Sequence, residues 1–297
     1  MWSALSILAC ATAEPSADSA DPGPVEPLFS FAIFADPHVT GEGENAERLR
    51  AAIDWVNVNA DVDDIDLVVI VGDIGWAGGE TLAFEILSTL AVPWVPVLGD
   101  NEVQYGSEQS FDQVFAVEYA ALAATFENWD RAATPVENPE YDKQSWFQDF
   151  SFDHGGAHFV GLDWNSRHLG GIEGEMADLH DFDGGSWRWL ATDLEGLAAG
   201  PDNRVLFFSH HPMHLSPGAF DLAEIDLLDG LLNTYDDAVF ANFAGHYHVS
   251  GDESDPARPL DVYVTDALWD DINTLRVVAV SGNEAALSYE QRLVELP

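Results

Sequence analysis

Short apolar runs recur along the chain and predict β-strands that are buried on both faces. They span 29–35, 67–71, 92–98, 205–208 and 239–243. Runs of this length without polar alternation are typical of strands covered on both sides in a layered α/β protein. We therefore expect a buried sheet whose strands are separated by other elements.

Between these runs, apolar residues return every three or four positions, as in helices with one buried face. The predicted helices span 44–59, 80–91, 110–129, 185–199 and about 219–232. Strands that alternate with helices favour α/β crossovers in the first half of the chain.

The second half of the chain is richer in predicted strands. These cover 158–163, 261–265 and a closing hairpin over 275–280 and 285–289. We therefore expect an α/β protein with two packed β-sheets flanked by helices, a four-layer sandwich, rather than one doubly wound sheet.

The composition is consistent with one large domain. Hydrophobic residues make up 47% of the 297 residues and aromatic residues 11%, which is enough for a single large core. The pattern predicts a catalytic domain over 29–297, after an N-terminal segment over 1–28. No apolar run is long enough to predict a membrane-spanning helix.

The N-terminal segment has a composition of its own. A short apolar stretch ends at Cys10, the single cysteine, and an acidic tether rich in Pro, Ala and Ser follows. It resembles a lipoprotein signal with Cys10 as the lipid acceptor, although no Lys or Arg precedes Arg48. We expect a protein of the cell envelope or a secreted one, anchored to membrane only through Cys10; the alternative is a disordered tail on a cytoplasmic enzyme.

The formal net charge is extreme, at -43, and Lys143 is the only lysine. Nucleic acids and anionic membranes are bound chiefly through basic side chains, so this surface argues against both as partners. Solubility or adaptation to salt is the simplest account of the charge. It also leaves cations in a site as the natural attraction for a small anionic substrate.

Five short motifs follow the predicted strands, and all of them contain metal-binding side chains. They are Asp36-Pro37-His38, Gly72-Asp73, Gly99-Asp100-Asn101-Glu102, His210-His211-Pro212 and Gly245-His246-Tyr247-His248. Each alone is weak, because an Asp after a strand often caps the next helix and a buried His is often a core residue. Loops at the carboxyl ends of such strands converge on one crevice, so the ordered set favours one site.

This ordered set resembles the calcineurin-like metallophosphoesterases, the superfamily of purple acid phosphatases and class III cyclic nucleotide phosphodiesterases. The resemblance covers nearly all of residues 29–293 and implies a dinuclear metal centre. It implies that one metal is held by Asp36, His38 and His248, the second by Asp100, His210 and His246, and that Asp73 bridges both. Mixed His and carboxylate ligands suit Mn, Fe, Zn or Ni better than Ca.

The chemistry of phosphate-ester hydrolysis agrees with this set. The reaction needs a nucleophile in line with the leaving group and neutralised phosphoryl oxygens, and two cations with a hydroxide between them provide both. The sequence therefore predicts a metallophosphoesterase that hydrolyses phosphomonoesters or phosphodiesters. The alternative is a catalytically weak metal-binding or envelope-associated binding protein on the same fold.

The third motif departs from the family pattern, which usually reads Gly-Asn-His-acid. Here Asp100 keeps a metal-binding oxygen, while Asn101 replaces a histidine that lies near the leaving group. A register in which Asn101 is the ligand stays open at this point. We expect Asn101 and His211 at the reacting end of the site, with His211 or His168 as replacement proton donors. The stretch 165–185, which contains His168 and His180, is either a lid or a long solvated loop.

Overall fold

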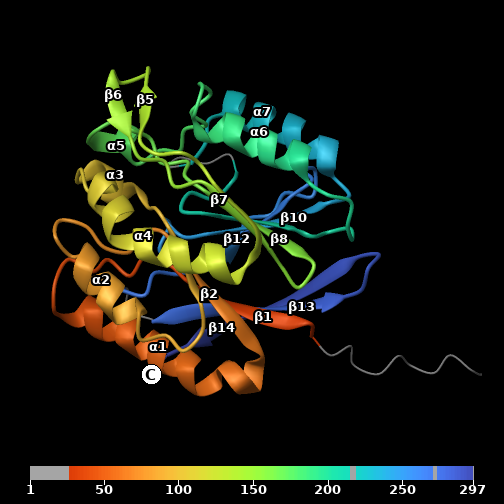
Figure 1. Cartoon of the computed structure of the whole chain (residues 1–297), viewed down its shortest axis with the longest axis horizontal. Helices are drawn as coiled ribbons and strands as arrows, with labels where there is room; N and C mark the ends of the chain where they lie inside the picture. The colour runs from red at the N-terminus through yellow and green to blue at the C-terminus, as the bar shows by residue number, and fades with distance from the viewer. Residues whose placement is uncertain (1–26, 215–218, 270–272, 297) are drawn as a thin grey trace, which may run out of the picture.

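Two β-sheets face each other across a core of aromatic and aliphatic side chains (Figure 1). The computed structural model describes residues 27–214, 219–269 and 273–296. Cys10 and the tether after it lie outside this part of the chain. Among the described residues, no helix combines the length and the apolar character needed to cross a membrane.

The first sheet has five strands in the order β14-β13-β1-β2-β3. Their bounds are β1 Phe29–Phe34, β2 Ile65–Val71, β3 Trp94–Val97, β13 Thr274–Gly282 and β14 Leu287–Glu295. Strands β1, β2 and β3 run parallel, and the closing hairpin of β13 and β14 adds to β1 in the antiparallel direction.

The second sheet has seven strands in the order β11-β12-β10-β9-β8-β7-β4. Their bounds are β4 Glu127–Arg131, β7 Phe150–His154, β8 Ala157–Leu162, β9 Val205–Ser209, β10 Val239–Ala244, β11 Gly251–Asp252 and β12 Asp261–Val264. Strands β8, β9, β10 and β12 are parallel. A separate small hairpin joins β5 Val136–Asn138 to β6 Lys143–Ser145.

Helices cover the outer faces of both sheets (Figure 1). On the side of the five-stranded sheet lie α1 Glu44–Asp63 and α2 Glu80–Leu87; on the side of the other lie α6 Ser186–Gly196 and α7 Leu222–Leu232. Helix α4 Glu108–Thr125 contacts both β3 and β4, the edge strands of the two sheets. The shorter helices are α3 Asp100–Gln104, α5 Gly171–Gly174 and the 3₁₀ turn η1 Asn233–Tyr235.

The sheets are joined by aromatic contacts. Phe31 of β1 is fully buried, and its ring lies 5.5, 5.6 and 5.7 Å from those of Phe159, Phe208 and Phe243 on the other sheet. Edge-to-face contacts of this kind stabilise the core beyond the area that they bury. The predicted fold class, two packed sheets flanked by helices, is confirmed.

One local prediction is wrong, and a second is only partly right. The helix predicted over 110–129 ends at Thr125, because Phe126 is extended and stacks on Phe152 at 4.4 Å, while the next residues pair with β7 as β4. The stretch 165–185 is only partly a solvated loop, since Asn165, Arg167 and His180 are buried in it. Arg167 is held there by two hydrogen bonds to the carboxylate of Asp163, at 2.9 and 2.7 Å.

Candidate metal centre

All five motifs lie at the carboxyl ends of strands, and they meet where the two sheets adjoin. Three follow β1, β2 and β3 of the first sheet, and two follow β9 and β10 of the second. Parallel strands send their following loops to one edge. The site is therefore built from both sheets, which explains why its residues are far apart in sequence.

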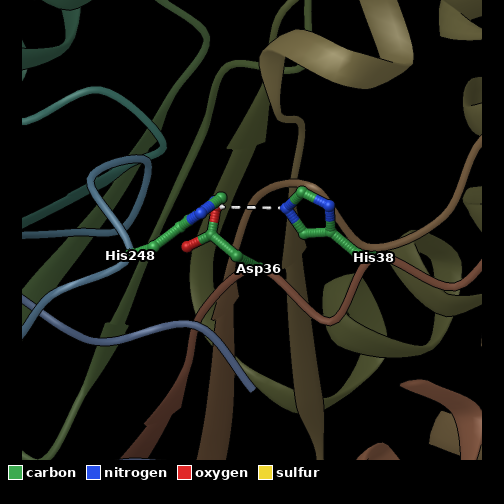
Figure 2. Close-up of side chains that lie close together, drawn as sticks. All are labelled: Asp36, His38 and His248. Atoms are coloured by element: carbon green, nitrogen blue, oxygen red, sulfur yellow. Dashed lines mark ion pairs between the residues drawn. The ribbon is translucent and has the colours of Figure 1, made fainter. Parts of the chain in front are cut away.

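One ligand group consists of Asp36, His38 and His248 (Figure 2). The two imidazoles approach the buried carboxylate of Asp36 from opposite sides. Their Nε2 atoms lie 3.9 Å (His38) and 3.6 Å (His248) from Asp36 Oδ1. The three donor atoms lie within 4.8 Å of one another, which is the spacing expected of ligands around one cation.

The carboxylate of Asp73 faces both this group and a second group of candidate ligands, which includes His210. Its Oδ2 lies 3.2 Å from His38 Nε2, and its Oδ1 lies 3.6 Å from His210 Nε2. Asp73 is buried, with 1% of its surface exposed. The two oxygens of a single carboxylate therefore face two different histidines, as in the arrangement that the sequence predicts for Asp73.

The second group is formed by Asp100, His210 and His246. His210 Nε2 lies 3.0 Å from Asp100 Oδ1 and 3.3 Å from His246 Nδ1. The other nitrogen of His210 lies 3.0 Å from the backbone oxygen of Val71, to which it donates, and Gln104 donates to Asp100 Oδ2 at 2.7 Å. Such outer hydrogen bonds fix the tautomer and direct the remaining lone pairs inward.

His211 belongs to the same group. It is completely buried, its Nε2 lies 3.1 Å from the carbonyl of Glu175, and its Nδ1 has no hydrogen-bond partner. One of its ring nitrogens lies within 4.8 Å of donor atoms of Asp100 and His246. The structure thus places His211 beside the candidate ligands Asp100 and His246.

The backbone at the site is strained. Most of the predicted ligands have a positive φ, which costs free energy for any residue other than glycine. The values are 47° at Asp36, 53° at His38, 51° at Asp73, 70° at His246 and 52° at His248. Such conformations persist where the surrounding fold imposes them, and they cluster at functional sites.

Two glycines allow the motifs to approach one another. Gly72 has φ +91, and a Cβ there would clash with the ring of His210; a Cβ on Gly245 would clash with the carboxylate of Asp36. Each glycine precedes a ligand-bearing loop and faces a ligand from another strand. A larger side chain at either position would push two ligands apart.

The acidic donors are held in the charged form that a metal ion needs. Burial alone raises the pKa of Asp36, but the surrounding histidines bring it well below its usual range. Burial likewise raises the pKa of Asp73, and the charge of His210 together with His38 lowers it to about 2. Both carboxylates are therefore ionised near neutral pH.

The imidazoles complete a donor set that fits transition-metal ions. Burial lowers the pKa of His211 and His246, and the nearby charge of His210 lowers both further, so both rings are neutral near pH 7. His38 Nε2 is buried without a hydrogen-bond partner, although Asp73 Oδ2 is 3.2 Å away. Burial alone lowers the pKa of His38 and His210, but the surrounding carboxylates raise both, that of His38 to about 9, so a metal ion would displace a proton from each of these two rings. Imidazole nitrogens beside buried carboxylates are the ligands preferred by Mn, Fe, Zn and Ni.

The third motif resolves the question of register. Asn101 donates its backbone N–H to Asp73 Oδ1 at 3.0 Å, and its side-chain amide also contacts Asp73. Asp100 therefore lies among the candidate donor atoms, and Asn101 holds the carboxylate that faces both groups.

Glu102, to which sequence reasoning gave no role, ties the loops together. It is fully buried and accepts from the backbone N–H groups of Gly75 and Gly99, each at 2.9 Å. Burial, with the charge of Asp73, raises its pKa to about 8. The acid at the end of the Gly-Asp-Asn-Glu motif was the available signal for this contact.

The other histidines of the sequence analysis lie outside the two groups. His168 is half exposed and pairs with Glu173 at 2.9 Å, and His214 is half-buried with its ring 5.7 Å from that of Tyr247. His180 Nδ1 lies 3.2 Å from Glu140 Oε2, in a contact separate from both groups. Sequence reasoning also missed the aromatic rings beside His38, those of Trp76 and Trp269.

Comparison with known proteins identifies the family. The family model of calcineurin-like phosphoesterases matches residues 29–250. No curated protein matches the chain in sequence.

Among solved structures, one from Staphylococcus aureus, assigned as a 5′-nucleotidase and solved in complex with α-ketoglutarate, is similar, with 15% identity and a TM-score of 0.56. The match covers 90% of this chain and 54% of that protein, so this chain spans about half its length. The phosphopantetheinyl hydrolase of Mycobacterium tuberculosis matches at 9% identity, with a TM-score of 0.47 and coverage of 80% of this chain and 90% of that one. On the match of the family model, the chain belongs to the calcineurin-like phosphoesterase family.

Proposed function

We propose that the chain is a metal-dependent hydrolase of phosphoric esters that uses two transition-metal ions. One observation carries this proposal: the two oxygens of Asp73 face two separate histidines, His38 at 3.2 Å and His210 at 3.6 Å. Each histidine belongs to its own group of donor atoms. A carboxylate shared in this way suits two cations about 3.5–4 Å apart, the spacing of two-metal phosphatases.

Two ions in these groups would neutralise phosphoryl oxygens and lower the pKa of the water that attacks phosphorus. The residues of the chain prepare the site for this role. The carboxylates of Asp36 and Asp73 are ionised, and the rings of His211 and His246 are neutral. Asn101 fixes Asp73 through its backbone and side-chain N–H groups, so the orientation of this carboxylate is set in advance.

The same contact bears on the leaving group. Asn101 points its amide at Asp73, and an amide does not release a proton to a departing alkoxide. Esters whose leaving groups depart without a proton should therefore react best. Aryl esters and phosphoanhydrides are of this kind, and simple alkyl esters are not.

The alternative is a metal-binding protein with little turnover, which the absence of a histidine at position 101 favours. Activity of metal-stripped and reloaded protein separates the two. We expect hydrolysis of p-nitrophenyl phosphate or bis(p-nitrophenyl) phosphate that needs added Mn, Fe, Zn or Ni. Comparison of these two substrates also decides between monoester and diester preference.

The matched variants are Asp36→Asn, which removes a buried ligand, and Asp61→Asn, which changes an exposed carboxylate on α1. We expect Asp36→Asn to abolish the activity and Asp61→Asn to retain it. Metal binding without turnover of either substrate would favour the alternative over the hydrolase.

A further inference from the structure

Two exposed aromatic side chains lie beside the metal centre. Tyr105 is 62% exposed and Trp269 is 36% exposed. Among the residues that the structure describes, every other Phe, Tyr and Trp side chain is buried or half-buried. Exposed rings of this size leave apolar surface in water, so finding both at the rim of one site calls for a functional account.

Trp269 packs against the first ligand group. Its ring lies 5.2 Å from that of His38 at an interplanar angle of 44°, and 5.2 Å from that of His248 at 89°. The segment before it is anchored to the end of β1, because Leu268 donates to the backbone oxygen of Ala35 at 2.9 Å. The ring is thus held next to two ligands by the strand that leads to the site.

Tyr105 lies near His38 through a second aromatic ring, that of Trp76. The buried ring of Trp76 lies 4.8 Å from that of His38, and Tyr105 stacks on Trp76 at 5.8 Å with an interplanar angle of 24°. Tyr105 closes the short helix α3, where its N–H donates to the oxygen of Asn101 at 3.0 Å. The ring is therefore positioned by the same turn that carries Asp100.

We propose that Tyr105 and Trp269 form a stacking site for a planar aromatic group of the substrate ester, beside the reacting phosphoryl group. This inference rests on the proposed function and names its substrate class. Rings that touch His38 and Trp76 are close enough to the metal groups to hold the organic part of an ester whose phosphoryl group lies there.

The charge of the chain favours recognition by stacking. With 53 acidic and 10 basic residues, the protein has few cations to spare for substrate recognition. A neutral ring can instead be held by its π-face, which needs no charged partner, and stacking tolerates different ring systems. Where the ester oxygen is attached directly to the ring, as in an aryl ester, the aromatic group is also an acidic leaving group, which is the kind that Asn101 favours.

Binding of two non-hydrolysable phosphonates tests the inference without relying on turnover. Benzylphosphonate and cyclohexylmethylphosphonate have the same charge and similar size, and they differ in the planarity of the ring. We expect metal-loaded protein to bind benzylphosphonate about tenfold more tightly in calorimetric titration, the scale of one stacked ring. Equal binding of the two compounds would overturn the inference.

Variants locate the preference. Tyr105→Ala and Trp269→Ala should each reduce the ratio of the two dissociation constants, and the double variant should bring it to about one. Tyr105→Phe and Trp269→Phe should keep most of it, because a ring is enough. Leu293→Ala, at a 47% exposed position on β14, is the matched control and should leave the ratio unchanged. A preference that survives the double alanine variant would contradict the assignment.

A second pair of ligands identifies the source of the ring. Adenosine 5′-monophosphate and ribose 5-phosphate differ by the base alone. If adenosine 5′-monophosphate binds about tenfold more tightly and the double alanine variant loses this difference, the site is assigned to a nucleobase. An advantage limited to benzylphosphonate assigns it to a simple aryl group. If the protein prefers the aromatic phosphonate but hydrolyses no ester, the stacking site is supported and the hydrolase proposal fails. If the protein hydrolyses esters but shows no preference for the aromatic ligand, the hydrolase proposal is supported and the stacking site fails.

Discussion

Two clusters of histidine and carboxylate lie at opposite ends of the seven-stranded sheet, and they differ in what balances their charge. At the amino end of β8, His158 lies between Asp153 and Asp193, with its ring nitrogens 2.6 and 3.0 Å from their oxygens. One protonated imidazole satisfies both carboxylates by direct hydrogen bonds. This cluster is closed and needs no further cation.

At the carboxyl ends of the strands the arrangement is open. His38 Nε2 and His211 Nδ1 are buried without hydrogen-bond partners, and nitrogens of His210 and His246 face each other at 3.3 Å. Proximity of His to Asp is therefore a poor sign of a metal site by itself. Side-chain nitrogens and oxygens that converge from several loops with some of them unpaired, on a strained backbone, are the better sign.

The largest expected effect is that of Asp73→Asn, which removes the carboxylate shared by both groups. We expect activity on an activated ester to fall about 10²–10³-fold or more, the scale for losing a preorganised charge in an active site. The fold should remain, because the variant removes one of several buried negative charges. Steady-state kinetics and circular dichroism measure the two effects; near-normal activity would end the two-metal account.

A smaller effect is expected for Asn101→His, which restores a proton donor beside Asp73. We expect hydrolysis of alkyl esters to rise about tenfold to 10²-fold, near the lower end of general acid catalysis, with little change for aryl esters. The dependence of rate on leaving-group pKa should flatten accordingly. An unchanged dependence, together with a large loss in His168→Ala, would show that His168 supplies the proton.

Substitutions in the closed cluster should lower the free energy of unfolding without changing the activity. Asp153→Asn removes one partner of His158, and we expect a loss of about 1–2 kcal/mol in the free energy of unfolding, as for a hydrogen bond to a charged group. Urea denaturation measures the loss. Metal content and kcat/KM should match the wild type, in contrast to Asp73→Asn; a fall in metal content would mean that the two ends are coupled.

The pH dependence of stability gives the smallest and most specific signal. Burial alone lowers the pKa of His158, but Asp153 and Asp193 raise it to about 9, above the usual histidine value of 6.5. A raised pKa means that the folded state holds the proton more tightly, so the stabilisation is complete below about pH 6.5 and is lost as pH rises through about 9. The stability gap between wild type and His158→Gln should close over this window. A gap that widens there would contradict the ion-pair account.

The convergence of the candidate ligands could be predicted from the sequence because nearly all of their motifs follow an apolar run, and parallel strands bring such positions together. The roles of Asp100 and Asn101 could not be separated, since either side chain offers an oxygen and only the contact of Asn101 with Asp73 decides between them. The burial of His211 was also hidden, because adjacent residues at a strand end point in different directions.

The errors in the fold have a similar cause. Phe126 and Trp129 fit the helical spacing of the preceding residues, but their rings stack on Phe152 and Phe150 of a strand that comes later in the sequence. Long-range contacts of this kind override local periodicity. The buried part of 165–185 was missed for the same reason, because Arg167 finds its carboxylate partners only in the folded chain.

The central claim is that the open cluster, and not the closed one, holds two metal ions. Elemental analysis of protein reloaded with a single transition metal and freed of excess tests it most directly, in wild type, Asp73→Asn and Asp153→Asn. We predict two ions per chain in the wild type and in Asp153→Asn, and fewer in Asp73→Asn. One ion or none in the wild type, or equal loading of all three proteins, would contradict the account.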